Sequence, residues 1–411
     1  MLEHLPILQV VAPLLAAPIA ALMRRRGSAW LLAVLATWAS LAISVLLLLR
    51  VREMGTLVYP LGGWPAPWGI EYRVDLISAY VLLIVSGIGA IVTPYAGQSV
   101  AREVGPKQAP LLYSALLLCL AGLLGITITG DVFNLFVFLE ISSISAYALI
   151  AMGPDRRALH AAYKYLIMGS IGATFIVIGI GMMYMMTGTL NMADLAERLP
   201  LFGNRTITVA FAFLAVGISL KLALFPLHQW LPDAYTYAPS SVTAFLASTA
   251  TKVAVYMLLR VFFTVFGVVF AFETMSLHWT LLPLALLAVI SASLTAIYQE
   301  NVKRLLAYSS VAQIGYMILG VSLATVTGLT AGMLHLFNHA LIKATLFMAV
   351  GAVMYQVGSV RIEAMAGLAK RMPWTMAAFV AGGLSLIGVP LTVGFVSKWY
   401  LVLGAVEQGM W

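Results

Sequence analysis

The chain has a single cysteine in 411 residues, Cys119, which lies in an apolar run. One thiol cannot form a disulfide within the chain, and it supplies too few ligands for an iron–sulfur cluster or a thiolate zinc site. We therefore expect no bound metal, no cofactor and no electron transfer through this polypeptide.

Charged residues are also scarce, at 9% of the chain against 62% hydrophobic residues. Soluble domains carry about 25% charged residues, and the mean hydropathy here is +1.00. Apolar runs of about 20 residues, long enough to span a bilayer, recur along the whole chain. The predicted fold class is an all-α polytopic membrane protein. We expect about twelve spans, at residues 5–23, 30–49, 74–95, 110–129, 131–152, 161–186, 206–227, 239–266, 279–298, 305–325, 329–356 and 374–408.

The net charge of +8 reflects topology, and we expect no nucleic-acid partner. Alternate loops hold twelve basic residues, and the loops on the opposite side hold five. The positive-inside rule assigns the richer side to the cytoplasm and the N-terminus to the outside. The richer set is Arg24, Arg25, Arg26, Arg102, Lys107, Arg156, Arg157, Lys303, Arg304, Arg361, Lys370 and Arg371, and the poorer set is Arg50, Arg52, Arg73, Arg198 and Arg205. The first span precedes basic residues rather than following them, so we expect a retained helix and not a signal peptide.

The chain also resembles itself at an offset near 170 residues. Ala173-Thr174 and Met183-Tyr184 recur as Ala344-Thr345 and Met354-Tyr355. The offset covers five spans, and an odd number inverts the second copy relative to the membrane. Pro226 and Pro390 are expected to break the seventh and twelfth helices at equivalent places. The predicted divisions are an N-terminal three-helix region (1–109) with an external hairpin at 50–75, a first five-helix unit (110–266) and a second (279–411).

Five lysines lie inside the predicted spans: Lys164, Lys221, Lys252, Lys343 and Lys398. Each costs about 2.5–3.5 kcal/mol in a membrane unless it is paired, neutralised or hydrated. The sequence therefore predicts a polar path through the membrane. Snorkelling to the interface explains Lys164 equally well, because it lies near one end of its span.

Glu140 is the only acidic residue deep within a span. One interpretation is a protonated, hydrogen-bonded core glutamate. The other is a carboxylate whose proton affinity is set by a movable lysine, and Lys221 is the natural candidate for that lysine.

His335, His339 and Lys343 repeat at i, i+4 and i+8 on one face of a predicted helix. Because histidine titrates near neutrality, such a row can relay protons; the alternative is a pair of satisfied core histidines. A haem or metal site would need ligands from a facing helix. Lys252 is expected to connect the two five-helix units, and His228 either feeds protons inward or bonds to exposed carbonyls. The glycines of the sixth span (Gly169, Gly172, Gly179 and Gly181) predict close helix packing.

Three motifs carry a resemblance to a known family: Phe225–Tyr235 (FPLHQWLPDAY), Phe337–Lys343 (FNHALIK) and Gly394–Lys398 (GFVSK). They resemble the proton-translocating antiporter-like subunits of respiratory complex I, membrane-bound hydrogenases and Mrp-type cation/proton antiporters. Gly62–Gly69 and Thr187–Ala193 look most similar to the D-type subunits of the Mrp antiporters. The resemblance implies two inverted five-helix half-channels joined by a lateral polar axis.

By resemblance, Glu140, Lys221, Lys252, the pair His335 and His339, and Lys398 match the family's buried charged and histidine positions. The implied function is proton conduction in a multisubunit Na⁺/H⁺ antiporter of a bacterial inner membrane, with other membrane subunits as partners and no enzyme activity of its own. The alternatives are a pumping subunit of complex I (NADH-quinone oxidoreductase) or of a hydrogenase, and a structural scaffold. Family members usually have about fourteen helices, so we expect either a fragment ending at Trp411 or a partner that completes the second half-channel.

Overall fold

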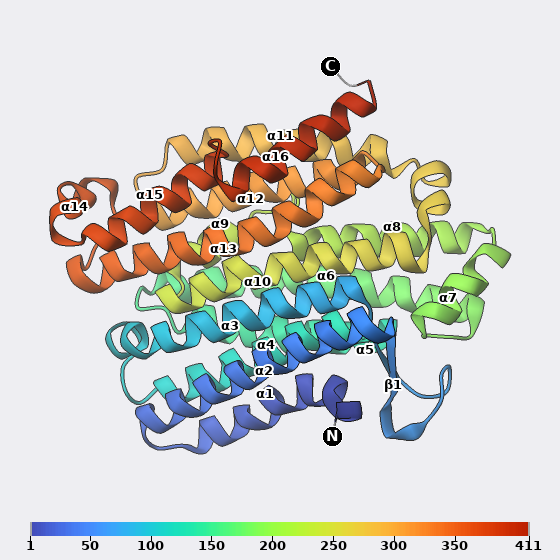
Figure 1. Cartoon of the computed structure of the whole chain (residues 1–411), viewed down its shortest axis with the longest axis horizontal. Helices are drawn as coiled ribbons and strands as arrows, with labels where there is room; N and C mark the ends of the chain where they lie inside the picture. The colour runs from blue at the N-terminus through green and yellow to red at the C-terminus, as the bar shows by residue number, and fades with distance from the viewer. Residues whose placement is uncertain (1, 410–411) are drawn as a thin grey trace.

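The apolar runs fold into long helices that lie side by side, as Figure 1 shows for the computed structural model, which describes residues 2–409. The N-terminal region contains α1 (Leu5–Leu22), α2 (Arg26–Met54) and α3 (Leu76–Glu103). The middle of the chain contains α4 (Ala109–Ile128), α5 (Val132–Ala151), α6 (Arg157–Thr187), α7 (Met192–Arg198), α8 (Arg205–Leu222), α9 (Leu231–Tyr237) and α10 (Ser240–Leu259). The C-terminal part contains α11 (Leu277–Ile297), α12 (Val302–Ser322), α13 (Val326–Val357), α14 (Leu368–Arg371), α15 (Pro373–Ile387) and α16 (Val393–Glu407).

The all-α membrane fold is confirmed: eleven helices within residues 2–409 are long and apolar enough to cross a membrane. Short elements join them, including two π-helical turns after α10, Arg260–Val265 and Val269–Thr274. The hairpin expected at residues 50–75 is present as β1 (Leu57–Pro60) paired antiparallel with β2 (Glu71–Val74).

Both predicted helix breaks exist, and the seventh span ends earlier than expected. The seventh span stops as α8 at Leu222 rather than at residue 227, because Ala223 adopts a left-handed φ of 59°. The span 374–408, predicted to break at Pro390, consists of α15 and α16, and Leu391 between them has a φ of 74°. Such backbone is uncommon outside glycine and is stable only where packing holds it.

The predicted inverted repeat finds support in a recurring backbone bridge. Asp131 pairs with Asn191, and Asn301 pairs with Arg361, each 170 residues further along the chain. Asp131 and Asn301 also cap the helices that follow them, α5 and α12. Since α5 and α12 run in opposite directions through the predicted membrane, the bridges lie on opposite sides of it. The repeat itself stays a prediction.

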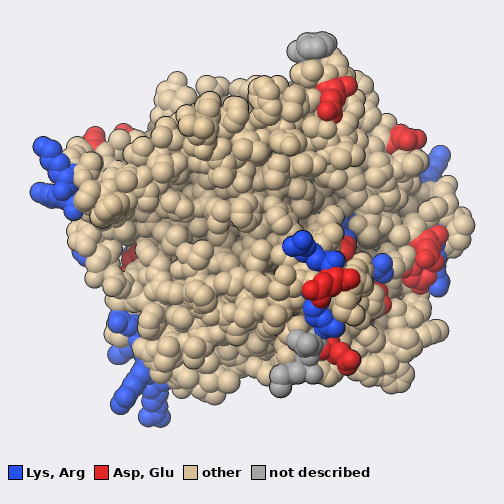
Figure 2. Space-filling model, viewed as in Figure 1, with Lys and Arg blue, Asp and Glu red and all other residues tan. Residues whose placement is uncertain are grey.

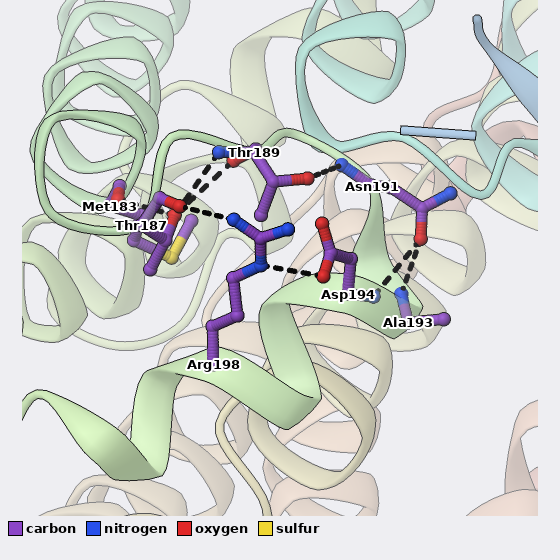
Figure 3. A network of polar contacts seen from close by, with 7 residues as sticks. All are labelled: Met183, Thr187, Thr189, Asn191, Ala193, Asp194 and Arg198. Atoms are coloured by element: carbon purple, nitrogen blue, oxygen red, sulfur yellow. Dashed lines mark hydrogen bonds and ion pairs between the residues drawn. The ribbon is translucent and has the colours of Figure 1, made fainter. Parts of the chain in front are cut away.

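The loop after α6 is held by a polar network (Figure 3). Arg198 of α7 donates to the carbonyl of Thr187 at 2.9 Å and to Asp194 at 2.7 Å. The Asn191 side chain accepts from the main-chain nitrogens of Ala193 and Asp194. The unpaired ends of α6 and α7 are thereby satisfied.

The close packing predicted for α6 is largely confirmed. A Cβ added at Gly172 would lie 3.1–3.2 Å from α8, and one at Gly179 would lie 2.7 Å from Leu214. Gly169 packs on the Tyr147 hydroxyl. The prediction is wrong for Gly181, which has nothing within 4 Å of its would-be Cβ, because that side of α6 faces away from the bundle.

On the face drawn in Figure 2, charged side chains lie at one end of the bundle and in groups from just right of the centre to the other end, and most of the surface between is uncharged. Basic side chains dominate the end that carries α14 and the turn between α1 and α2, and the other end mixes acidic and basic side chains. This distribution fits the predicted cytoplasmic side, which we call the inner end below.

Candidate functional site

The predicted pair of Glu140 and Lys221 lies at the junction of α5 and α8. Lys221 Nζ is 3.5 Å from Glu140 Oε1, and it donates a hydrogen bond to Ser143 Oγ at 2.8 Å. The lysine side chain is only 5% exposed, whereas the glutamate side chain is 29% exposed. Glu140 therefore reaches the edge of the bundle, and Lys221 holds the buried side of the pair.

Lys221 lies before the predicted helix break and closer to it than expected. It is the penultimate residue of α8, so it lies in the last helical turn. The carbonyl end of a helix carries partial negative charge, which stabilises a cation there. The helix break thus lowers the cost of placing this ammonium in the membrane.

A small cavity of about 30 Å³ adjoins the pair. Lys221, Ser143 and Tyr165 line its polar part, and Cys119 lies on its apolar wall. A polar space of this size holds one or two water molecules. The cavity offers a place where a proton can leave or reach the lysine through water.

A second cluster is built on α10, α13 and α16. The His335 and His339 rings are parallel to within 7°, with centroids 6.0 Å apart, and both residues are buried. His335 Nδ1 lies 2.9 Å from Ser397 Oγ. His335 Nε2 and both ring nitrogens of His339 have no hydrogen-bond partner among residues 2–409, so these atoms are available to exchange protons.

Two fully buried lysines lie on the helices of this cluster, Lys252 on α10 and Lys343 one turn after His339 on α13. Lys252 Nζ donates to the carbonyl of Ala247 and to Thr251 within α10. Lys343 Nζ donates to Leu306 and Ser309 of α12. Each ammonium is therefore solvated by oxygen atoms of the helices and not by an acidic partner.

Lys398 closes the row at the break between α15 and α16. Its Nζ donates to the carbonyls of Leu386 and Ile387 and lies 4.7 Å from the centroid of the Tyr316 ring. Tyr316 in turn contacts His335, with ring centroids 6.0 Å apart. Lys398 is thus connected to the histidines through one aromatic ring.

The remaining predicted residues lie at the inner end. Lys164 forms an ion pair with Asp233 at 3.0 Å. His228 lies at the predicted helix–loop boundary between α8 and α9, stacks on Phe225 and leaves Nδ1 without a partner. Burial and the nearby charge of Lys164 lower the pKa of the His228 imidazole, so it is neutral near pH 7.

Sequence reasoning overlooked the groups that solvate these charges. Asp233 and the hydroxyls of Ser143, Ser309 and Ser397 each contact one of the predicted lysines or histidines. Asp233 lies in the FPLHQWLPDAY motif and Ser397 in the GFVSK motif, yet nothing in the sequence assigns a partner to any of the four residues. Within the described residues, no hydrogen bond or ion pair joins the Glu140–Lys221 pair directly to the histidine cluster.

Chemically, the two clusters are made of titratable side chains that are mostly buried. A carboxylate, four ammonium groups and two imidazoles lie in or beside helices that span the predicted membrane. No group of three His, Cys, Asp or Glu residues suitable for a metal ion occurs among residues 2–409. These residue types are the ones that can take part in proton transfer between titratable groups.

Comparisons with known proteins point in the same direction. The family model described as "NADH:quinone oxidoreductase/Mrp antiporter, TM" matches residues 129–411. The chain is 44% identical to the N-type subunit of an NADH-quinone oxidoreductase of Desulforudis audaxviator, over 100% of this chain and 82% of that protein. It is 33% identical to the D-type subunit of an Na⁺/H⁺ antiporter of Alkalihalophilus pseudofirmus, over 89% of this chain and 73% of that one.

Two solved structures have the same fold. A chain of the membrane-bound sulfane sulfur reductase, an archaeal respiratory membrane complex, is similar with a TM-score of 0.91 and 34% identity, over 99% of this chain and 82% of that chain. A chain of the Mrp complex of Dietzia sp. DQ12-45-1b is similar with a TM-score of 0.90 and 29% identity, over 99% of this chain and 75% of that chain.

Proposed function

Because the chain belongs to the NADH:quinone oxidoreductase/Mrp antiporter transmembrane family, we propose that it is the proton-conducting subunit of a multisubunit membrane complex of the cation/proton antiporter type. Sodium is the proposed cation, and the complex lies in a bacterial inner membrane with the N-terminus of this chain outside. The observation that carries the proposal is the Glu140–Lys221 pair at the broken end of α8, at 3.5 Å.

The pair works as a switch of proton affinity. When Lys221 is close, its charge favours the ionised carboxylate, and Glu140 holds no proton. When Lys221 withdraws, desolvation favours the protonated carboxyl group, and Glu140 takes up a proton. The left-handed Ala223 directly after α8 is the hinge about which the last turn moves, and the cavity beside Lys221 carries the proton through water.

The histidine cluster takes the proton across the second half of the chain. His335 and His339 exchange protons through water with Lys252 and Lys343 on one side and with Lys398 on the other. Each imidazole can bind and release a proton at pH values near neutrality once it is hydrated. Lys398, at the second break, controls release to the far side.

A second candidate function has its own support. The 44% identity to the N-type subunit of an NADH-quinone oxidoreductase and the fold of a respiratory reductase complex favour a pumping role whose energy comes from redox chemistry elsewhere in the complex. The two candidates differ in the source of energy. Moving one charge through 100 mV is worth about 2.3 kcal/mol, so an ion gradient alone can drive exchange.

The test measures proton flux in sealed vesicles that carry the complete complex. A Na⁺ gradient without an electron donor is expected to drive proton movement, and Glu140→Gln is expected to reduce it to the level of vesicles without the complex. Glu300→Gln is the matched control, because Glu300 is an exposed glutamate paired with Arg361. Full transport by Glu140→Gln would contradict the proton-conducting role, and flux that requires an electron donor would select the second candidate.

A further inference from the structure

Asp233 of α9 is shared between two basic residues from distant parts of the chain. Lys164 of α6 lies 3.0 Å from Oδ2, and Arg304 of α12 lies 3.2 Å from Oδ1. The carboxylate is 18% exposed, and each basic side chain is about one-third exposed. One short helix therefore joins the first five-helix unit to the second at their inner ends.

The start of α9 is fixed to the switch region of α8. Trp230 Nε1 donates to the carbonyl of Leu220 at 3.0 Å, one residue before Lys221. The Trp230 ring also stacks on Tyr165, with centroids 3.8 Å apart and planes within 6°. Because Trp230 is buried and lies three residues before Asp233, a displacement of the last turn of α8 acts directly on α9.

The far end of α9 is fixed as well. Lys303 of α12 donates to the carbonyl of Ala238 at 3.1 Å. Glu103 of α3 accepts from the main-chain nitrogen of Ser240 at 2.8 Å. Both ends of α9 are therefore held by hydrogen bonds to other helices, α8 at its start and α12 and α3 at its end.

On the other side, α12 holds Lys343. Its Nζ donates to the carbonyl of Leu306 at 2.7 Å and to Ser309, two and five residues after Arg304. A contiguous chain of contacts thus runs from Lys221 through Leu220, Trp230, Asp233 and Arg304 to Leu306 and Lys343. It reaches Lys343 without passing through His335 or His339.

We propose that α9 couples the two proton sites mechanically, with Asp233 as the positioning residue. Movement of Lys221 at the end of α8 shifts α9, and the shared carboxylate transfers that shift to the N-terminal turn of α12. The oxygen atoms that solvate Lys343 then move relative to its ammonium group. This inference rests on the proposed function of the Glu140–Lys221 pair, and it assigns a role to the Trp and Asp of the FPLHQWLPDAY motif.

The first test uses charge removal in the complete complex. Asp233→Asn keeps the size of the side chain, and it is expected to lower proton flux by about 10-fold or more, which corresponds to at least about 1.4 kcal/mol in the barrier. Arg304→Gln is expected to lower flux similarly, and the double variant is expected to match the single ones, because both act through the same contact. Asp233→Glu is expected to restore most of the flux. Asp155→Asn is the control, since it removes an exposed inner ion pair with Arg157.

The second test measures coupling without transport. Hydrogen exchange of residues 300–309 is first compared between the native chain and Glu140→Gln. The same comparison is then made with Asp233→Asn present in both proteins. We expect Glu140→Gln to alter exchange in this segment, and we expect Asp233→Asn to remove the difference. If Asp233→Asn does not assemble, Arg304→Gln takes its place, because its side chain is partly exposed.

The outcomes separate the two proposals. The exchange experiment overturns the coupling if Glu140→Gln does not alter exchange in the native background, or if the difference persists undiminished when Asp233→Asn is added. The flux experiment overturns it if Asp233→Asn has wild-type flux, or if the losses of the two single variants multiply in the double variant. Full transport by Glu140→Gln contradicts the proton-conducting role instead, and the exchange experiment still decides whether α9 links α8 to α12.

Discussion

Lys398 donates a hydrogen bond to the carbonyl of Leu386, 3.0 Å away, so that an ammonium group from α16 lies at the carbonyl end of α15. Lys221 lies in the last turn of α8 itself, and its Nζ donates to Ser143 Oγ and not to a main-chain carbonyl. Both lysines lie near the negative, carbonyl end of a broken helix, which stabilises a cation. At the second break the freed carbonyl groups also accept hydrogen bonds from the lysine directly.

Replacement of Lys398 by methionine tests this setting at the second break. Lys398→Met keeps the length of the side chain and removes its charge, so the path to the far side loses a proton carrier. We expect proton flux to fall by about 10-fold or more, which corresponds to at least about 1.4 kcal/mol in the barrier. Lys370→Met, in exposed α14, is the control, and equal flux in both variants would exclude a role for Lys398.

The hydroxyl of Ser143 is expected to hold Lys221 in place. Ser143→Ala removes the acceptor 2.8 Å from Nζ. Hydrogen bonds to charged groups are worth about 1.5–3 kcal/mol, so flux should change by about 10-fold. Ser142→Ala is the matched control, because the neighbouring hydroxyl donates only to the carbonyl of Leu139 in its own helix. Identical flux curves for the two variants would show that Ser143 does not position the lysine.

Packing between α6 and α8 predicts unequal effects of two alanine substitutions. A Cβ at Gly217 would lie 2.7 Å from the carbonyl oxygen of Gly172. Gly217→Ala should therefore destabilise the protein by about 1–3 kcal/mol, as overpacking does. Gly181→Ala meets nothing within 4 Å and should be neutral or stabilising by up to about 1 kcal/mol. Thermal midpoints in detergent measure both, and the reverse order would contradict the packing.

An ion pair at the outer end predicts how stability depends on pH. Burial raises the pKa of the Asp75 carboxyl, but the hydrogen bond and the charge of Arg260 outweigh burial and hold that pKa below its usual range. A depressed pKa gives stability that is present above the unfolded pKa of about 3.9 and is lost as the pH falls through the folded pKa. Asp75→Asn should cost about 1–3 kcal/mol at pH 7.

The measurement is the thermal midpoint of the two proteins from neutral to acidic pH. The gap between the native chain and Asp75→Asn should be widest near pH 7 and should close below the unfolded pKa. Asp155→Asn is the control: the hydrogen bonds from Arg157 also lower the pKa of Asp155, but this exposed pair adds little stability. A gap that is constant across the range would show that the charge of Asp75 does not matter.

The sequence by itself determined the membrane class and nearly every span. Apolar runs of bilayer length can only become helices in a membrane, because each main-chain group must be satisfied within its own segment. The same reasoning singled out the lysines and Glu140, since a charge in such a run stands out whatever its partners are. Proline and polar residues also located the two breaks, although Pro226 lies four residues after α8 ends.

The sequence indicated Lys221 as the partner of Glu140, but only the tertiary structure decided what the other charges contact. Lys164 and Asp233 are 69 residues apart in sequence, and Lys221 and Ser143 are 78 apart, so their contacts depend on how whole helices pack. Local sequence specifies the depth of a residue in the membrane but not the neighbour it faces. For the same reason, the paired role of Asp233 and the division of the buried groups into two clusters emerged from helix packing alone.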